Sequence, residues 1–460
     1  MATPSEACEA CGSMVRRLVP FLVAAVLPST VVAQSADRAL LTELAKVKAV
    51  DAHSHLLINR VEPAGKALAQ QRSPTDLPLR LRGLGPEWAR TWKLLYKVNV
   101  ADPSDKRFTE PEKRFADLQQ ARELLVEDLG ADFSTSMLDQ ANVEMAIVSG
   151  DPLTGKGLER FRFVPRADVF LRPFAQESAE ALKPFFIAAR MYTLPKGLDE
   201  YLRKVVTAAL ERWVSEGAIG IDLGISAWRG LDFDDVNAEV ARAAYGRLVI
   251  GGEFGASPAD MKAFQDYTFR YLAAEAGRVG LVMHVKTGMS RDATGIVGFG
   301  NPILLGSSMA DPRLQKTRWL LVHGGFPFDK ETGPLLLRPN VYADVSVQDL
   351  VRSPTELGES LRRWFELAPE RVCFATDAAS DPSAPQLRWP ELTFLGAETT
   401  RAALAIALSR MVSDGLVTKA QALQIGKGVL RDNALTLHGL GPQQAQDASP
   451  AAASAERVAR

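Results

Sequence analysis

Four of the five histidines in this sequence follow short apolar runs of the kind that form buried strands. His53 and His55 make a His-x-His pair, His284 ends Leu-Val-Met-His, and His323 ends Leu-Leu-Val-His. Asp377 follows one more such run, Cys-Phe-Ala-Thr. Imidazoles with a carboxylate are typical ligands of Zn²⁺ and, less strictly, of Fe²⁺ and Mn²⁺. The sequence therefore predicts a divalent-metal site, most simply for Zn²⁺, with these five residues as ligands.

Such a site predicts hydrolytic chemistry. A metal with an open coordination position lowers the pKa of bound water towards neutrality, so that a nucleophile exists at working pH. Asp377 can ligate the metal and also accept the proton of that water. His323 can polarise a substrate carbonyl or ligate a second metal. We therefore assign catalytic roles to Asp377 and His323.

Apolar, β-branched runs that alternate with helical stretches predict the elements that position these residues. After an opening strand around Val50, the predicted strands are 143–149, 184–190, 218–223, 279–285, 319–323, 341–345 and 372–376. Near-continuous apolar strands separated by helices are typical of a parallel sheet covered by helices. Eight of them predict an α/β fold of the (β/α)8 TIM-like barrel type, whose strand ends meet at one mouth. A doubly wound sheet is the alternative, although no Gly-x-Gly-x-x-Gly follows a strand.

The segment 56–140 is mostly helical in pattern and predicts a helical insertion after the first strand. Trp88, Trp92 and Tyr96 are spaced at i, i+4 and i+8, which is one helix face. Packing is the favoured interpretation of this stripe. As an insertion after the first strand, 56–140 would form a lid over the site within a barrel domain of 34–440.

The ends of the chain differ from this domain. Arg16 and Arg17 precede an apolar run that ends in Val31-Val32-Ala33, which is typical of a signal peptide over 1–33, cut near Ala33-Gln34. The run is short and broken by proline, so we expect a secreted or periplasmic protein with no stable membrane association after cleavage; an uncleaved anchor is the alternative. The aperiodic tail 441–460 is expected to be disordered.

Charge and composition limit the kinds of partner that the protein is expected to bind. The formal net charge is −1, and no basic stripe indicates a nucleic-acid partner. Of three cysteines only Cys373 would remain after signal cleavage, so we expect no internal disulfide. A small-molecule substrate is the expected partner, and the sequence leaves the oligomeric state open, a homo-oligomer included.

The ligand pattern resembles the amidohydrolase superfamily. More specific stretches carry this resemblance from Val50 to about Leu440: 301–305 (Asn-Pro-Ile-Leu-Leu), 321–327 (Leu-Val-His-Gly-Gly-Phe-Pro), 340–346 (Asn-Val-Tyr-Ala-Asp-Val-Ser) and 375–378 (Ala-Thr-Asp-Ala). They are similar to the amidohydrolase-related (type 2) branch, near the amidohydrolase-like domain of FluG-type proteins and more distantly to uronate isomerases. The resemblance implies a metal-dependent hydrolase that cleaves a C–N or C–O bond of a small carbonyl or carboxylate substrate.

The chain departs from this pattern at the fourth strand. Binuclear members carry a lysine there that bridges two metals, and here Asp222 stands in about its place. The resemblance therefore implies a mononuclear or loosely binuclear site, and a decarboxylase or uronate-type isomerase is the alternative function. A non-catalytic binding protein is a third hypothesis.

Three cationic residues are candidates for substrate binding. Lys286 lies two residues after His284, on the same strand face. Arg229 follows the predicted fourth strand and Arg190 ends the predicted third. A guanidinium can pair with a substrate carboxylate through two parallel hydrogen bonds. The alternative is an ordinary surface ion pair for each arginine and a solvated side chain for the lysine.

Overall fold

The computed structural model describes residues 36–55, 76–83, 85–98, 111–153, 158–255, 257–289, 295–381, 384 and 386–441. The predicted signal peptide lies outside this range, as does the predicted tail beyond residue 441, so both stay predictions. Among the described residues, no helix combines the length and apolar character that crossing a membrane requires.

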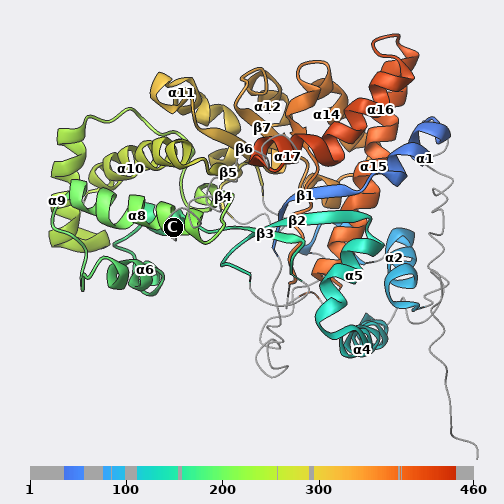
Figure 1. The fold of residues 1–460 in the computed structure, drawn as a ribbon, viewed down its shortest axis with the longest axis horizontal. Helices are drawn as coiled ribbons and strands as arrows, with labels where there is room; N and C mark the ends of the chain where they lie inside the picture. Colours follow the sequence, from blue (N-terminus) through green and yellow to red (C-terminus); the bar gives the residue numbers. More distant parts are fainter. Residues whose placement is uncertain are drawn as a thin grey trace, which may run out of the picture.

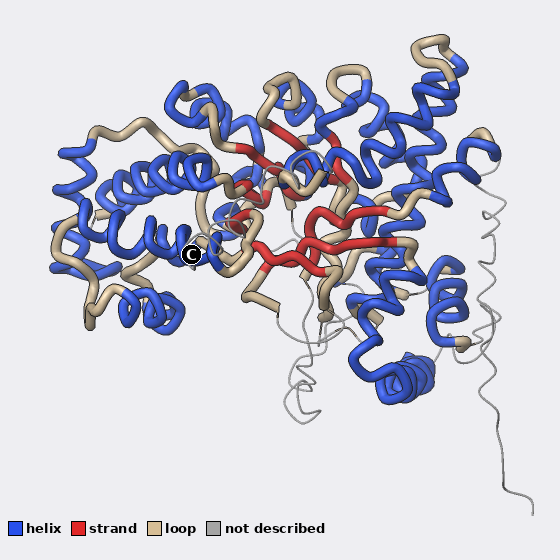
Figure 2. Tube along the Cα trace, viewed as in Figure 1, coloured by secondary structure: helices blue, strands red, loops and turns tan. Residues whose placement is uncertain are grey.

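Parallel strands alternate with helices, which confirms the predicted α/β class. β1 (Ala49–Ser54), β2 (Val143–Ser149) and β3 (Phe161–Val164) form one parallel sheet in chain order. A second parallel sheet contains β4 (Gly220–Leu223), β5 (Val282–Lys286), β6 (Arg318–Val322), β7 (Val341–Asp344) and β8 (Val372–Cys373). Both sheets lie at the centre of the molecule with helices around them (Figures 1 and 2).

Hydrogen bonds join the two sheets in two places, between β3 and β4 and between β8 and β1. Beyond β3, the amide of Ala167 donates to the carbonyl of Asp222 on β4 at 2.9 Å. Beyond β8, the amide of Asp377 donates to the carbonyl of His53 at 2.9 Å, and His55 donates to Ala378 at 2.8 Å. The second connection brings Asp377 beside the His-x-His pair, although they are more than 300 residues apart in sequence.

The helices that follow the strands cover the sheets. Their bounds are α6 (Gln176–Ala188), α7 (Leu198–Tyr201), α8 (Ala208–Ser215), α9 (Ala238–Gly255), α10 (Pro258–Val279), α11 (Gly306–Ala310), α12 (Asp329–Leu335), α13 (Gln348–Val351), α14 (Pro354–Phe365), α15 (Trp389–Ser413), α16 (Lys419–Lys427) and α17 (Asn433–His438). A short helix α1 (Arg38–Lys46) precedes β1 and begins at Asp37, whose side chain accepts from the amide of Ala39.

The prediction of the third strand was wrong. Residues 184–188 belong to helix α6, and the strand is Phe161–Val164, paired in parallel with β2. A short apolar run fits a strand and one side of a helix equally well by pattern. Here Leu182 is buried while Ile187 is 74% exposed, as expected of a helix with one buried side.

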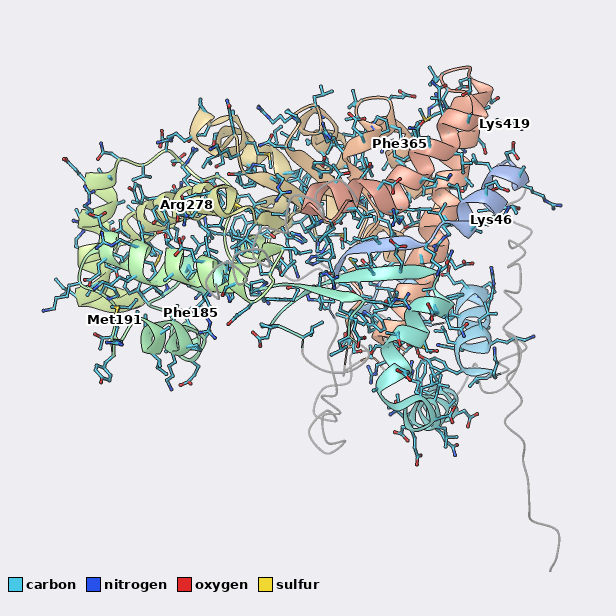
Figure 3. The ribbon with its side chains drawn as sticks, in the orientation of Figure 1. Lys46, Phe185, Met191, Arg278, Phe365 and Lys419 are labelled. Atoms are coloured by element: carbon cyan, nitrogen blue, oxygen red, sulfur yellow. The ribbon has the colours of Figure 1, made fainter. Side chains whose placement is uncertain are left out.

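This correction moves Arg190 away from a strand end. Arg190 follows α6 in a left-handed conformation with φ 54° and is exposed. Its neighbour Met191 and Phe185 of α6 lie at the periphery of the molecule, away from the strands (Figure 3). Arg190 therefore does not lie at a strand end, where a substrate was expected to bind.

The described part of 56–140 is helical and is anchored to elements that follow β7 and β8. It contains α2 (Pro86–Tyr96), α4 (Pro111–Leu129) and α5 (Phe133–Gln140). Trp88 and Trp92 are fully buried, which confirms the predicted packing role of the stripe. Arg80, just before α2, donates to the carbonyl of Asp349 on α13 at 2.9 Å and to Thr399 Oγ1 on α15 at 3.0 Å.

Helix α17 lies at the amino ends of the strands. Arg318, the first residue of β6, donates to the carbonyl of Leu437 at 2.6 Å, and Asn433 Nδ2 donates to the carbonyl of Val372, where β8 begins, at 2.7 Å. Apolar side chains of α17 share one buried cluster with residues from seven of the strands: Val50, Ala52, Ile147, Val164, Val282, Leu320, Val322, Tyr342, Cys373, Ala375, Ala434, Leu435 and Leu437. The closing helix thus covers the end of this core opposite to the strand ends that carry His53 and Asp377.

Candidate metal centre

Three of the predicted ligands converge at the carboxyl ends of β1 and β8. One ligand atom each from His53, His55 and Asp377 lies within 4.8 Å of the others. Asp377 Oδ1 is 3.0 Å from His55 Nε2 and 3.5 Å from His53 Nε2. His53 and Asp377 are buried and His55 is partly exposed, so the group is open to solvent on one side only.

His323 joins this group from the end of β6. Its Nε2 lies 3.5 Å from Asp377 Oδ1. The side chain of Asp344, the last residue of β7, accepts from the His323 amide at 2.9 Å, and Gln348 Nε2 donates to the His323 carbonyl at 3.0 Å. These bonds hold His323 at φ 68°, and Asp377 has φ 50°. Left-handed backbone is costly for residues other than glycine and tends to occur at functional sites, where the surroundings enforce it.

The residues present fit a divalent cation. Among the described residues, Nε2 of His53 and Nε2 of His323 are buried without a hydrogen-bond partner. A buried polar atom left without a partner costs about 1–3 kcal/mol. Both nitrogens face the same carboxylate oxygen. A cation beside that oxygen would satisfy the His53 nitrogen, and a substrate oxygen would satisfy that of His323. Two imidazoles and a carboxylate, with His323 next to them, are donors that suit Zn²⁺.

His284 lies behind His53. Its Nδ1 is 3.4 Å from Nδ1 of His53, the ring nitrogen that points away from Asp377. Its Nε2 is 2.9 Å from Nε2 of His438 on α17. The structure therefore places His284 in contact with a ligand and not among the three convergent atoms, and its predicted role as a direct ligand stays a prediction.

Lys286 and Asp222 set the charge of the site. Lys286 Nζ lies 3.2 Å from His55 Nε2, and Asp222 is fully buried, with Oδ2 accepting from Ser149 Oγ at 2.5 Å. Burial together with the charge of Lys286 lowers the pKa of His55 to about 4. Burial alone would raise the pKa of Asp377, but the charges of His323 and Lys286 outweigh it and hold this pKa well below its usual value. At neutral pH, His55 is therefore neutral while Asp377 is ionised.

Arg229 is engaged in the loop that follows β4. Its guanidinium donates to Asp266 Oδ1 at 2.8 Å and to Gln265 Oε1 at 3.1 Å, and it also lies over the ring of Phe233. These contacts support a structural role, which was the alternative interpretation. A substrate carboxylate would have to compete with Asp266 for this arginine.

An arginine that the sequence analysis missed follows the true third strand. Arg166 pairs with Asp168 Oδ2 at 3.0 Å, and 59% of its side chain is exposed. Its Nη2, the Oδ1 of Asp168 and the aliphatic Cδ of Lys286 all lie within 4 Å of the position that a Cβ on Gly224 would occupy, so the Arg166–Asp168 pair and the stem of Lys286 pack around one glycine. The missed signal is Pro165-Arg166 after Phe-Arg-Phe-Val, a strand too short to stand out by pattern.

Comparisons with known proteins agree with this arrangement. A family model described as amidohydrolase matches residues 203–439, which include His284, His323 and Asp377 but not the His-x-His pair. None of the curated proteins compared matches the chain.

Three solved structures share the fold. A protein described as a metal-dependent hydrolase from Lactobacillus casei ATCC 334 is 16% identical, with a TM-score of 0.56 over 85% of this chain and 95% of that one. A uronate isomerase from Thermotoga maritima is 15% identical, with a TM-score of 0.56 over 87% of this chain and 97% of its own. A glucuronate isomerase from Caulobacter crescentus is 16% identical, with a TM-score of 0.54 over 91% and 97%. At these identities the likeness concerns the fold alone.

Proposed function

This chain belongs to the amidohydrolase family, and from that premise we propose that it is a metal-dependent hydrolase. It would use activated water to cleave a C–N or C–O bond of a small carbonyl or carboxylate substrate. The observation that carries this proposal is the convergence of His53, His55 and Asp377, with a buried His53 nitrogen that has no hydrogen-bond partner among the described residues.

We also infer that the two sheets close into a (β/α)8 barrel. The hydrogen bonds from Ala167 to Asp222 and from Asp377 to His53 support closure, because they join both pairs of outer strands. A barrel places catalytic groups at the carboxyl ends of its strands, and His55, Asp377 and His323 lie at such ends. The insertion 56–140 would then cover part of the mouth.

The site residues have different roles in the proposed reaction. His53, His55 and Asp377 would hold the ion, which when bound lowers the pKa of water and polarises a carbonyl. Asp377, ionised at neutral pH, takes up the proton of the attacking water at a carboxylate oxygen. His323 Nε2 faces the same oxygen and donates a hydrogen bond to the carbonyl oxygen of the substrate.

Lys286 and Arg166 favour a substrate with a carboxylate. Both are cationic, both have an atom near Gly224, and Lys286 also contacts His55. Arg166 is paired with Asp168, so a substrate carboxylate would have to compete with that residue for it. A guanidinium and an ammonium on one side of a site can bind an anionic group next to the reacting bond. Arg166 thus takes the role that the sequence analysis gave to Arg190.

An isomerase or decarboxylase is the second candidate. Asp222 on β4 pairs in register with His284 on β5, at the strand where binuclear hydrolases would carry a bridging lysine. Two of the similar folds are isomerases. Product analysis in ¹⁸O-labelled water separates the candidates, because hydrolysis transfers solvent oxygen to the product and decarboxylation need not.

A metal-loaded protein inactive on a broad panel of amides, lactones, uronates and aromatic acids would favour the binding-protein hypothesis.

We further propose that the protein is exported after cleavage near Ala33-Gln34 and that it acts on a small molecule, without nucleic acid. Amino-terminal sequencing of protein recovered from the periplasm or medium tests the cleavage site. An intact amino terminus in the membrane fraction would instead support an uncleaved anchor.

The central experiment compares zinc content and hydrolytic activity in matched variants. We expect the wild type and Tyr192→Ala, at a side chain that is 99% exposed, to bind zinc equally. His55→Ala should lose the metal and, with it, activity by at least roughly 100-fold. Wild-type protein that holds no divalent metal, and an activity unchanged in His55→Ala, would contradict the proposal.

A further inference from the structure

The insertion after β1 is connected to His323 by hydrogen bonds that run through helix α13. Two residues along this connection have a left-handed backbone: His323, with φ 68°, and Val347, just before α13, with φ 64°. Val347 is β-branched and fully buried, so this conformation is especially costly for it. Such conformations persist only where the surroundings enforce them. The contacts around these two turns therefore determine where the His323 side chain points.

Gln348 joins the two turns. Its Nε2 donates to the His323 carbonyl at 3.0 Å, and its Oε1 accepts from Arg352 Nη1 at 2.7 Å. A guanidinium only donates, so Arg352 fixes the Gln348 amide with its oxygen towards Arg352 and its nitrogen towards His323. Gln348 is fully buried, and a Cβ on Gly324 would lie 2.8 Å from its Nε2. The chain after His323 therefore packs directly against this amide.

Arg80 of the insertion binds the other end of α13. Its Nη1 donates to the carbonyl groups of Asp349, at 2.9 Å, and of Arg352, at the end of the helix where carbonyl groups lack partners within the helix. Its Nε and Nη2 pair with the two carboxylate oxygens of Glu87 on α2 at 3.0 and 2.6 Å. Nη2 also donates to Thr399 Oγ1 on α15 at 3.0 Å. An arginine has five N–H donors, and here each of them has an acceptor.

We propose that Arg80 is a positioning residue for His323 and acts through α13 and Gln348. Arg80 holds the helix, and the helix holds Gln348 against the His323 carbonyl. The turn at His323 then keeps its Nε2 towards Asp377, 3.5 Å away. The inference rests on the proposed function for the role of His323, which is to donate a hydrogen bond to the substrate. A displacement of about 1 Å can cost roughly 100-fold in rate, so contacts this far from the substrate affect catalysis.

Arg90 provides a matched control on the same insertion. It lies on α2, and its Nη2 pairs with Glu398 Oε2 on α15 at 3.0 Å. Both arginines therefore connect the insertion to α15. In the part of the chain that the structure describes, Arg80 also bonds to α13 and Arg90 does not. Weaker anchoring of the insertion would affect both variants, whereas a displaced His323 is expected only when Arg80 is replaced.

The first measurement reports the position of His323 without metal or substrate. Protein labelled with ¹³C in histidine carbonyls and ¹⁵N in glycine gives correlated NMR signals only from the His-Gly pairs 323–324 and 438–439, and His438→Gln assigns them by removing the second. In metal-free protein, Gln348→Glu and Arg80→Met should each shift the 323–324 signal and leave the 438–439 signal in place. Gln348→Glu keeps an acceptor for Arg352 and loses only the donor to His323. Arg90→Met should shift neither signal.

The second measurement is steady-state kinetics of the zinc-loaded proteins on a substrate that the wild type hydrolyses. We expect kcat to fall roughly 10-fold or more in Gln348→Glu and in Arg80→Met, with KM and zinc affinity little changed, because His323 acts on the transition state. Arg90→Met should keep the wild-type kcat. Since Arg80 acts through Gln348, the double variant should be about as slow as the slower single variant. If Arg80→Met does not fold, Arg80→Lys makes the same comparison, because its three donors cannot replace all five contacts.

Three results would overturn the inference. The first is a folded Gln348→Glu or Arg80 variant with an unchanged 323–324 signal. The second is a loss of kcat in Arg90→Met that equals the loss in the Arg80 variant. The third is additive effects of the Arg80 and Gln348 substitutions on kcat. A wild type that hydrolyses nothing, with the 323–324 signal shifted in the variants as expected, would contradict the proposed function and leave the connection from Arg80 to His323 standing.

Discussion

At the scale of single residues, one carboxylate oxygen organises the site. Asp377 Oδ1 lies 3.0–3.5 Å from Nε2 atoms of His53, His55 and His323. The convergence of His53, His55 and Asp377 could be predicted from sequence, because the carboxyl ends of parallel strands meet. The contact between His284 and His438 could not, since the two residues are 154 positions apart in sequence.

We predict that the charge of Lys286 controls the pKa of His55. Replacing it with methionine in metal-free protein removes a charge 3.2 Å from His55 Nε2, so the pKa of His55 should rise from about 4. An NMR titration of the His55 ring measures this. If Lys286 also binds a substrate carboxylate, the KM of carboxylate substrates should rise roughly 10-fold or more, while Lys286→Arg keeps most of the affinity. An unchanged His55 titration would contradict the charge assignment.

Acid should destabilise the metal-free protein through its buried histidines. The pKa of His438 is about 4 when folded, against 6.5 ordinarily, so the unfolded chain takes up this proton first as the pH falls. Stability that is fully present above pH 6.5 is therefore lost as the pH falls towards 4, by about 1.4 kcal/mol per unit of pKa difference.

Thermal melting of zinc-free wild type and His438→Gln between pH 4 and 7 isolates this contribution. Asp51, whose pKa burial raises to about 7, titrates in the same range with the opposite sign, but it is common to both proteins. The wild type should lose more stability on acidification than the variant. Parallel curves would refute the assignment.

At the scale of elements, strand three shows where sequence patterns fail. The run 184–190 has the apolar character of a buried strand, yet it lies on a helix whose far side is exposed. The true strand has four residues, and one of them is Arg162. Only its pairing with β2 identifies it, and that pairing is a tertiary contact.

This correction can be tested on substrate binding. Arg166→Ala should raise the KM for carboxylate substrates roughly 10-fold or more with a smaller effect on kcat, because it removes a charged hydrogen-bond donor beside Lys286. Arg190→Ala, at an exposed position after α6, should leave both constants unchanged. Steady-state kinetics of both variants measures these constants. A larger rise of KM in Arg190→Ala than in Arg166→Ala would support the sequence-based assignment of Arg190 to substrate binding.

At the scale of the whole molecule, α17 and the candidate site lie at opposite ends of the buried cluster that α17 shares with the strands. The helix covers the amino ends of β6 and β8, and the candidate site lies at the opposite ends. The alternation of strands and helices could largely be predicted from sequence, because most of the strands are mainly buried and apolar. The contact of the last helix with His284 could not, because nothing in the sequence around His438 marks it as part of a site.

The most direct test of the account is anomalous X-ray diffraction at the zinc edge from crystals of the zinc-loaded protein. We predict a strong peak at about 2.0–2.2 Å from Nε2 of His53, Nε2 of His55 and a carboxylate oxygen of Asp377. His55→Ala crystals should lose that peak. A zinc-loaded wild type with no peak between these three residues, or with its peak elsewhere, would contradict the proposed metal centre.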